Sequence, residues 1–185
     1  MMKMRDHLKP LTSLVLAAGL LLFGQLACAA ETEPPTLAVL GFDLVDDHPD
    51  AARAELLRPR LAAIKTQLEK GLHERGLYRM VDPAAAQDLI NIQRASNEFL
   101  YRCNDCLGDV GKRLDTRLLA VGWVQRVSEL ILNINVLVLD SQTGVEVLSK
   151  SVDLRGNTDE TWMRGVNFML RDWAERRARN PRYGR

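Results

Sequence analysis

Two cysteines separated by two residues, Cys103 and Cys106, are the part of the sequence whose types and spacing point most directly to chemistry. A c-type haem needs a histidine directly after the second cysteine, and this chain has Leu107 there, which excludes haem. A zinc site needs two further ligands, and beyond residue 30 the chain offers only His48 and His73, far apart in sequence. A structural disulfide and a redox-active dithiol remain as the two interpretations.

The surroundings of the two cysteines favour the disulfide. A thiol oxidoreductase carries its cysteine pair directly after a first strand, at the start of a helix. Here the pair follows an irregular stretch that begins near residue 95 and precedes a short helix. We predict a disulfide between Cys103 and Cys106 in an oxidising compartment, with thiol activity as the alternative.

A second candidate site is the acidic stretch from Asp43 to Asp50, which also contains Asp46, Asp47 and His48. Oxygen ligands at this density could hold Ca²⁺ or Mg²⁺. The stretch lacks the Asp-x-Asp-x-Asp-Gly order and the glutamate at the twelfth position of a calcium loop. Carboxylates beside the N-terminus of a helix explain the same residues. We therefore predict no metal site and no cofactor.

A third cluster comes before the last helix and contains Asp153, Arg155, Asn157, Asp159 and Glu160, with Trp162 just inside that helix. Asn157 is expected to cap that helix, with Glu160 as its capping-box partner. The chain has no Gly-rich phosphate loop and no Gly-x-Ser-x-Gly motif, so we predict no catalytic residue and expect no enzyme. Arg155, Asn157, Asp159 and Trp162 are instead candidate contacts to a partner.

The first thirty residues are typical of a secretory signal peptide. Basic residues come first, an uncharged and mostly apolar run of eleven residues covers 14–24, and small residues end the segment. A bilayer span takes about 20 residues, so this run is too short to cross a membrane. We expect cleavage after Ala29 or Ala30 and a periplasmic protein.

Cys28 leaves a lipoprotein as the alternative to a soluble exported protein. Lipid attachment favours an aliphatic residue three positions before the cysteine, and this chain has Gln25 there. Membrane contact is therefore expected only if Cys28 is lipidated, because the acyl chains would then tether the domain.

The charge of the chain gives no reason to expect nucleic acid. It has 25 Lys and Arg against 24 Asp and Glu, a formal net charge of +1. The predicted organisation is a signal peptide over 1–30 and a single α/β domain over 31–185. That domain ends in a basic tail from about residue 176, which we expect to be solvated.

Apolar periodicity predicts the elements of the domain. Strands are predicted over 36–44, 77–81, 118–127, 130–140 and 145–154, and helices around 57–72, 83–94, 106–114 and from 157 onward. The order strand-helix-strand-helix-helix-strand-strand-strand-helix predicts an α/β (α+β) fold. Its mixed sheet has about five strands, and the helices pack on that sheet.

Two details of the helices can be tested directly. Pro59 is predicted in the first turn of the first helix, where its missing N–H has no consequence. In the last helix, Trp162, Val166, Met169 and Trp173 share one apolar stripe and are predicted to be buried against the sheet.

Several segments of the chain resemble a family of exported proteobacterial proteins of unknown function. They are LAVLGF at 37–42, CNDC at 103–106, VGWVQRVS at 121–128 and DLRGNTDETW at 153–162. This resemblance implies no activity and no catalytic residues. At the level of the fold, the chain is also similar to the α/β domain of curli-secretion proteins and the amino-terminal domain of the Tol-system propeller protein, which implies assembly and binding at the envelope.

These observations predict a non-enzymatic periplasmic binding or envelope-assembly accessory module of unknown ligand. Its partner is expected to be another envelope protein, held at an exposed sheet edge or at the corner formed by Arg155 and Trp162. The alternative is a thiol-active periplasmic accessory protein that uses Cys103 and Cys106.

Overall fold

Five strands form one mixed sheet in the order β2-β1-β3-β4-β5. The computed structural model describes residues 33–103 and 106–185, so the predicted signal peptide over 1–30 lies outside the described residues. The elements are β1 (Thr36–Asp46), α1 (Ala51–Glu74), β2 (Arg79–Met80), the 3-10 helix η1 (Pro83–Ala86), α2 (Gln87–Ser96), the 3-10 helix η2 (Leu100–Arg102), α3 (Gly108–Leu114), β3 (Leu118–Arg126), β4 (Ile131–Asp140), β5 (Glu146–Arg155) and α4 (Asp159–Arg179).

The pairing of the strands follows from their connections. β1 is parallel to β2 and to β3, and each of these neighbours is reached through helical segments. β3, β4 and β5 form an antiparallel meander joined by short turns, as expected for strands close in sequence. The predicted α/β fold, its mixed five-strand sheet and the order of its elements are confirmed.

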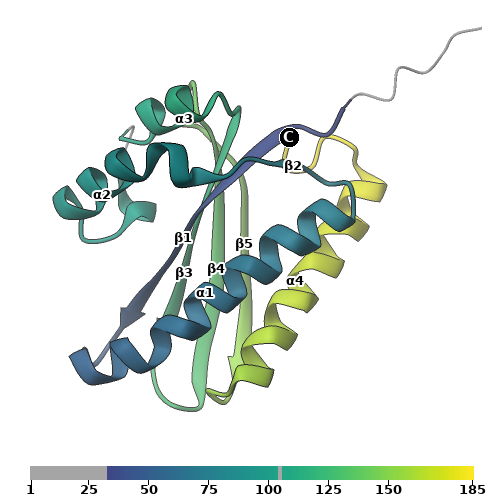
Figure 1. Cartoon of the computed structure of the whole chain (residues 1–185). Helices are drawn as coiled ribbons and strands as arrows, with labels where there is room; N and C mark the ends of the chain where they lie inside the picture. Colours follow the sequence, from purple (N-terminus) through teal and green to yellow (C-terminus); the bar gives the residue numbers. More distant parts are fainter. Residues whose placement is uncertain (1–32, 104–105) are drawn as a thin grey trace, which may run out of the picture. The chain divides into compact units, whose positions relative to one another are not determined.

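The two faces of the sheet are covered unequally. α1 and α4 lie side by side over one face (Figure 1), where the main core contains Leu37, Leu118, Ile134 and Leu154. On the other face a second core joins η1, α2, η2 and α3 to β1 and β3. Along β5 the side chains on this second face are exposed, and they include Ser149. The second face therefore stays open along that edge.

Helix α1 begins earlier than its apolar stripe. Asp50 is the N-cap, and its carboxylate accepts a 2.7 Å hydrogen bond from the backbone N–H of Arg53. Pro59 consequently lies inside the helix, so the prediction that it occupies the first turn is wrong. The helix ends before Gly76, which has a φ of +61° that a residue without a side chain adopts easily.

Helix α4 starts one residue later than predicted. Thr158, not Asn157, is the N-cap, and the capping box is closed by Thr161 instead of Glu160. Asn157 is not available for the cap because its side-chain oxygen accepts a 2.9 Å hydrogen bond from Trp162 Nε1. The predicted burial of the α4 stripe is confirmed, with Trp162 and its companions 0–1 % exposed.

The basic C-terminal end is packed against the domain, so the expectation of a solvated tail is wrong at Arg177. This side chain is 8 % exposed, and its guanidinium donates to the backbone oxygens of Tyr183 and Gly184. It also donates a 2.9 Å hydrogen bond to the phenolic oxygen of Tyr78, which precedes β2. The end of the chain is thereby held beside the first half of the domain.

Within residues 33–103 and 106–185, no helix combines the length and the apolar character that crossing a bilayer demands.

Candidate functional site

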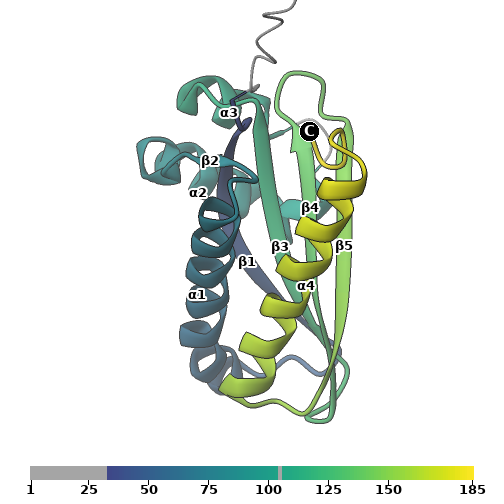
Figure 2. The same ribbon diagram turned by 90° about the vertical axis from the view of Figure 1, so that its right-hand side faces the viewer.

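Strand β5 is an open edge of the sheet. β4 lies on one side of it, and in the part of the chain that the structure describes no strand pairs with its other side. The strand is ten residues long and lies at the margin of the sheet beside α4 (Figure 2). Every second residue of such a strand directs its N–H and C=O groups away from the sheet, where they can pair with another chain.

A groove runs along this edge between β5 and α4. It consists of two adjoining pockets, of about 210 and 430 Å³, that share Ser151, Val152 and Phe168 as lining residues. Phe168 projects from α4 and is 54 % exposed, and it is a lining residue of both pockets. The exposed ring of Phe168 therefore provides apolar surface where the two pockets join, midway along the open edge.

The helix approaches the strand closely because α4 has a glycine at the contact. A Cβ atom added to Gly165 would overlap Leu154 Cδ2, so a larger residue would require the Leu154 side chain or the helix to shift. This close packing keeps Phe168 over the edge of β5.

Charged residues line one end of the groove. Lys150 of β5 is buried and forms an ion pair with Asp172 of α4, which also accepts hydrogen bonds from Arg176. The hydrogen bond from Lys150, followed by that from Arg176, holds the pKa of Asp172 below its usual value although burial opposes this. The carboxylate is therefore neutralised by its own neighbours.

The predicted partner residues fall at the other end of β5, but they do not share one role. Arg155 is exposed, lines the groove and makes no ion pair with any described residue. Trp162 is 1 % exposed, so its ring is part of the core. Asn157 bonds to Trp162 and to Glu129, and Asp159 pairs with Arg60. Arg155 alone among the four thus combines exposure with a free charge.

Two carboxylates of the acidic stretch are engaged by residues from other segments of the chain. Asp43 pairs with Arg94 and accepts a hydrogen bond from the backbone N–H of Leu100. Asp46 pairs with Arg126 at 2.8 Å and with Arg53 at 3.2 Å. Among the described residues no group of three or more His, Cys, Asp or Glu side chains is arranged to hold a metal ion.

Asp46 and Arg126 form a buried ion pair at the end of β1 and β3. Both side chains are 6 % exposed. Burial raises the pKa of Asp46, but hydrogen bonds from the backbone of His48 and from Arg126 and Arg53 outweigh it and lower the pKa overall. Glu129 extends this network through Arg126, and a hydrogen bond from Asn157 is the main cause of its lowered pKa. Through these contacts Glu129, in the β3–β4 turn, is joined to Asp46 at the end of β1 and to Asn157 before α4.

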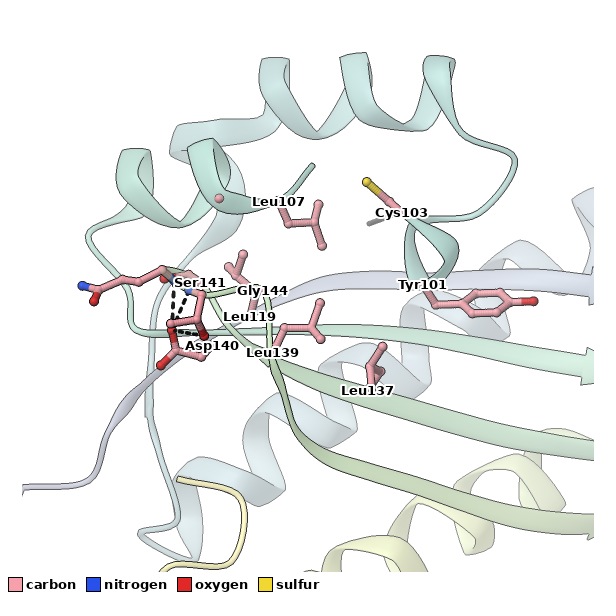
Figure 3. A pocket seen from close by; sticks show the side chains of 12 residues that line it. Tyr101, Cys103, Leu107, Leu119, Leu137, Leu139, Asp140, Ser141 and Gly144 are labelled. Carbon is pink, nitrogen blue, oxygen red and sulfur yellow. Dashed lines mark hydrogen bonds between the residues drawn. The ribbon is translucent and has the colours of Figure 1, made fainter. Parts of the chain in front are cut away.

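Cys103 borders a cleft of about 620 Å³ on the second face of the sheet. The sulfur atoms of Cys103 and Cys106 lie within disulfide distance of each other. In Figure 3, Leu107 above and Leu119 and Leu139 on the strands below point into the same space. Cys103 is 8 % exposed at the edge of this cleft.

An aromatic stack continues from the cleft across the second face. Tyr101 lies flat on Trp123, with ring centroids 4.1 Å apart, and Phe99 stacks on Tyr101 at 5.7 Å. The guanidinium of Arg102 lies 5.3 Å from the Phe99 ring. Trp123 is aligned with Asn135 of β4, so the stack borders the open part of this face.

Sequence reasoning did not single out Phe168, the apolar centre of the groove. Its signal was present, because Phe168 falls outside the apolar stripe that Val166, Met169 and Trp173 define on α4. A large aromatic residue on the polar side of an amphipathic helix exposes apolar surface that a partner could cover.

The fold and the groove place the protein in the class of α/β domains with a mixed sheet, one covered face and an open edge along β5. Residues 35–173 match the family DUF3280, described as "Protein of unknown function (DUF2380)". The chain belongs to this family, which confirms the expected membership of a family of unknown function. The comparison with curated proteins finds no match.

Solved structures with a similar fold come from bacterial proteins. Lipoprotein GNA1162 from Neisseria meningitidis is 18% identical, with a TM-score of 0.46, over 80% of this chain and 98% of that chain. The C-terminal domain of LpoB from Salmonella enterica is 14% identical, with a TM-score of 0.40, over 69% and 87%. TolB from Acinetobacter baumannii is 10% identical, with a TM-score of 0.41, over 80% of this chain and 29% of that chain.

Proposed function

We propose that the protein is a non-enzymatic binding or envelope-assembly accessory module of the bacterial periplasm, which holds another envelope protein at the edge of β5. The observation that carries this proposal is the open ten-residue edge with a groove beside it. The periplasmic location rests on the secretory character of residues 1–30.

An open edge of this length needs a reason in a stable protein. Unpaired N–H and C=O groups along a strand invite pairing with other chains, and proteins usually shorten, charge or cover such edges. β5 carries charged residues, among them the buried Lys150 and the exposed Asp153, but among the described residues no strand pairs with its outer side, and Phe168 borders it. A strand that is long, uncovered and bordered by an exposed aromatic residue is suited to receive a partner.

Site-specific photo-crosslinking in periplasm tests this function. A benzoylphenylalanine placed at Ser151 should give one discrete adduct with an envelope protein. The same group at Lys70, exposed on α1, is the matched control and should not give that adduct. Identical adducts from both positions, or none from Ser151, would contradict the proposal.

A thiol-active accessory protein is the second candidate function, because Cys103 borders a cleft that a substrate could enter. The test is an insulin-reduction assay with the reduced protein. Rapid reduction of insulin that disappears in the Cys103→Ser variant would favour this function over the binding module.

A further inference from the structure

We infer that the β5–α4 groove takes an acidic, extended segment of a partner polypeptide, which adds to the sheet as a strand beyond β5. This inference rests on the proposed binding function and names the chemistry of its partner. Backbone hydrogen bonds to β5 would hold the segment, and the groove would select its side chains.

The edge of β5 sets the conformation of the occupant. A chain that pairs with a strand edge must itself be extended, so that successive side chains point to opposite faces. Every second side chain then lies on the face covered by α4, and the remaining ones lie beside the exposed Ser149 and Ser151. A helical segment could not satisfy the unpaired N–H and C=O groups of this edge.

The groove favours an incoming segment with one apolar side chain. Phe168 and the half-buried Val152 meet at the middle of the edge and line both adjoining pockets. One apolar side chain of the incoming segment, on its α4-facing side, would cover Phe168 and remove it from water.

The positive charge of the groove favours acidic residues in the remainder of the incoming segment. Four basic side chains line the groove against two acidic ones: Lys150, Arg155, Arg164 and Arg176 against Asp153 and Asp172. Lys150 and Arg176 share Asp172, and Arg164 pairs with the exposed Glu160, so Arg155 is the lining cation without an ion pair among the described residues. The guanidinium of Arg171 lies 5.8 Å from the Phe168 ring and adds a further positive charge. The surface is therefore complementary to carboxylates.

The same charge argues against a second copy of this chain as the occupant. Two copies that paired through their β5 edges would bring two basic grooves together, and like charges across an interface oppose association. Arg155 and Arg171 form no ion pair with any described residue, so their charge remains available to an acidic segment.

The experiment selects ligands from a phage library of random ten-residue peptides on the immobilised mature protein. Enriched peptides should alternate in polarity and carry Asp or Glu around one apolar residue. The best peptide is then synthesised in two N-methylated forms, each methylated at every second residue but in opposite phase. Only one phase should weaken binding, by at least about tenfold, because only one set of N–H groups faces β5.

Protein variants locate the binding. Phe168→Ser should weaken the peptide at least about fivefold, whereas Ile92→Ser, at a residue 56 % exposed on α2, should not. The double variant Arg155→Glu/Arg164→Glu should abolish the preference for acidic peptides. Its control, Lys70→Glu/Lys112→Glu, makes the same change of charge at exposed sites outside the groove. Thermal unfolding of each variant shows that it is folded.

The inference would be overturned by no enrichment, by enriched peptides that are basic, or by binding that tolerates both methylation phases. A concentration-dependent dimer that the Phe168→Ser change abolishes would identify a second copy as the occupant and would also overturn it. A position-specific crosslink at Ser151 without any acidic peptide would leave the binding function standing and reject only this class of partner.

Discussion

At the scale of single residues, Arg177 is a buried cation that forms no ion pair with a described carboxylate. Its guanidinium is buried and has hydrogen-bond acceptors but no carboxylate among the described residues. Burial is the main cause of its lowered pKa, and burial also raises the pKa of Tyr78 to about 12. A cation with these contacts serves to join the backbone of Tyr183 and Gly184 to the domain.

Removal of this side chain should therefore cost stability. Arg177→Ala is expected to lower the free energy of unfolding by about 2–3 kcal/mol, because buried carbonyl groups lose their donor. The control is Arg179→Ala, an exposed residue of the same helix, which should change stability by less than about 0.5 kcal/mol. Urea unfolding measures both, and equal losses would refute a special role for Arg177.

The two cysteines give a second prediction at this scale. We expect a structural disulfide between Cys103 and Cys106, with a reduction potential below about −250 mV. Changing both to serine should lower stability by about 2 kcal/mol, since the closed loop is short. A glutathione titration followed by mass spectrometry measures the potential. A value near that of dedicated oxidants, about −120 to −180 mV, would support the thiol-active alternative.

At the scale of elements, the start of α4 depends on Thr158. Its hydroxyl accepts a 3.2 Å hydrogen bond from the backbone N–H of Thr161. Thr158→Ala should cost about 1 kcal/mol, the usual effect of losing an N-cap. Thr66→Ala, an exposed substitution within α1, is the matched control and should be neutral or slightly stabilising because alanine favours helices. The prediction fails if both variants unfold at the same urea concentration.

At the scale of the whole molecule, the lowered carboxyl pKa values predict acid sensitivity. Asp46, Glu129 and Asp172 each have a folded pKa below the unfolded value. Each therefore contributes stability that is complete above its unfolded pKa and is lost as pH falls through the folded pKa. Urea midpoints should accordingly drop between about pH 5 and pH 3.

A variant identifies the source of this pH dependence. Asp46→Asn should lower stability at pH 7 and flatten the decline at acid pH, because the asparagine cannot be protonated. Asp109→Asn removes an exposed carboxylate and should leave the profile unchanged. A wild-type midpoint that does not move between pH 5 and pH 3 would exclude any net contribution from these carboxylates.

Export is the remaining prediction for the whole molecule. Intact-mass measurement of the periplasmic protein should show a chain that starts at Ala30 or Glu31, as the basic start and the short apolar run of the leader indicate. A mass that includes a diacylglyceryl group on Cys28 would instead establish a lipoprotein.

The sequence by itself determined the local elements and the fold class. Helical and alternating periodicities record which side chains face the core, so the strands around Leu37 and Ile134 and the buried face of α4 could be predicted. The first residues of the helices were harder to predict from the sequence, because Asp50 and Thr158 act as caps only in the geometry that the folded chain gives them.

Only the tertiary structure decided which residues meet. The open edge of β5 follows from the strand order, which places the last strand at the margin of the sheet. The exposure of Phe168, the burial of Arg177 and the pairing of Asp46 with Arg126 depend on segments far apart in the chain. Periodicity describes how a segment divides its own side chains between core and solvent, but it carries no information on which distant segment packs beside it.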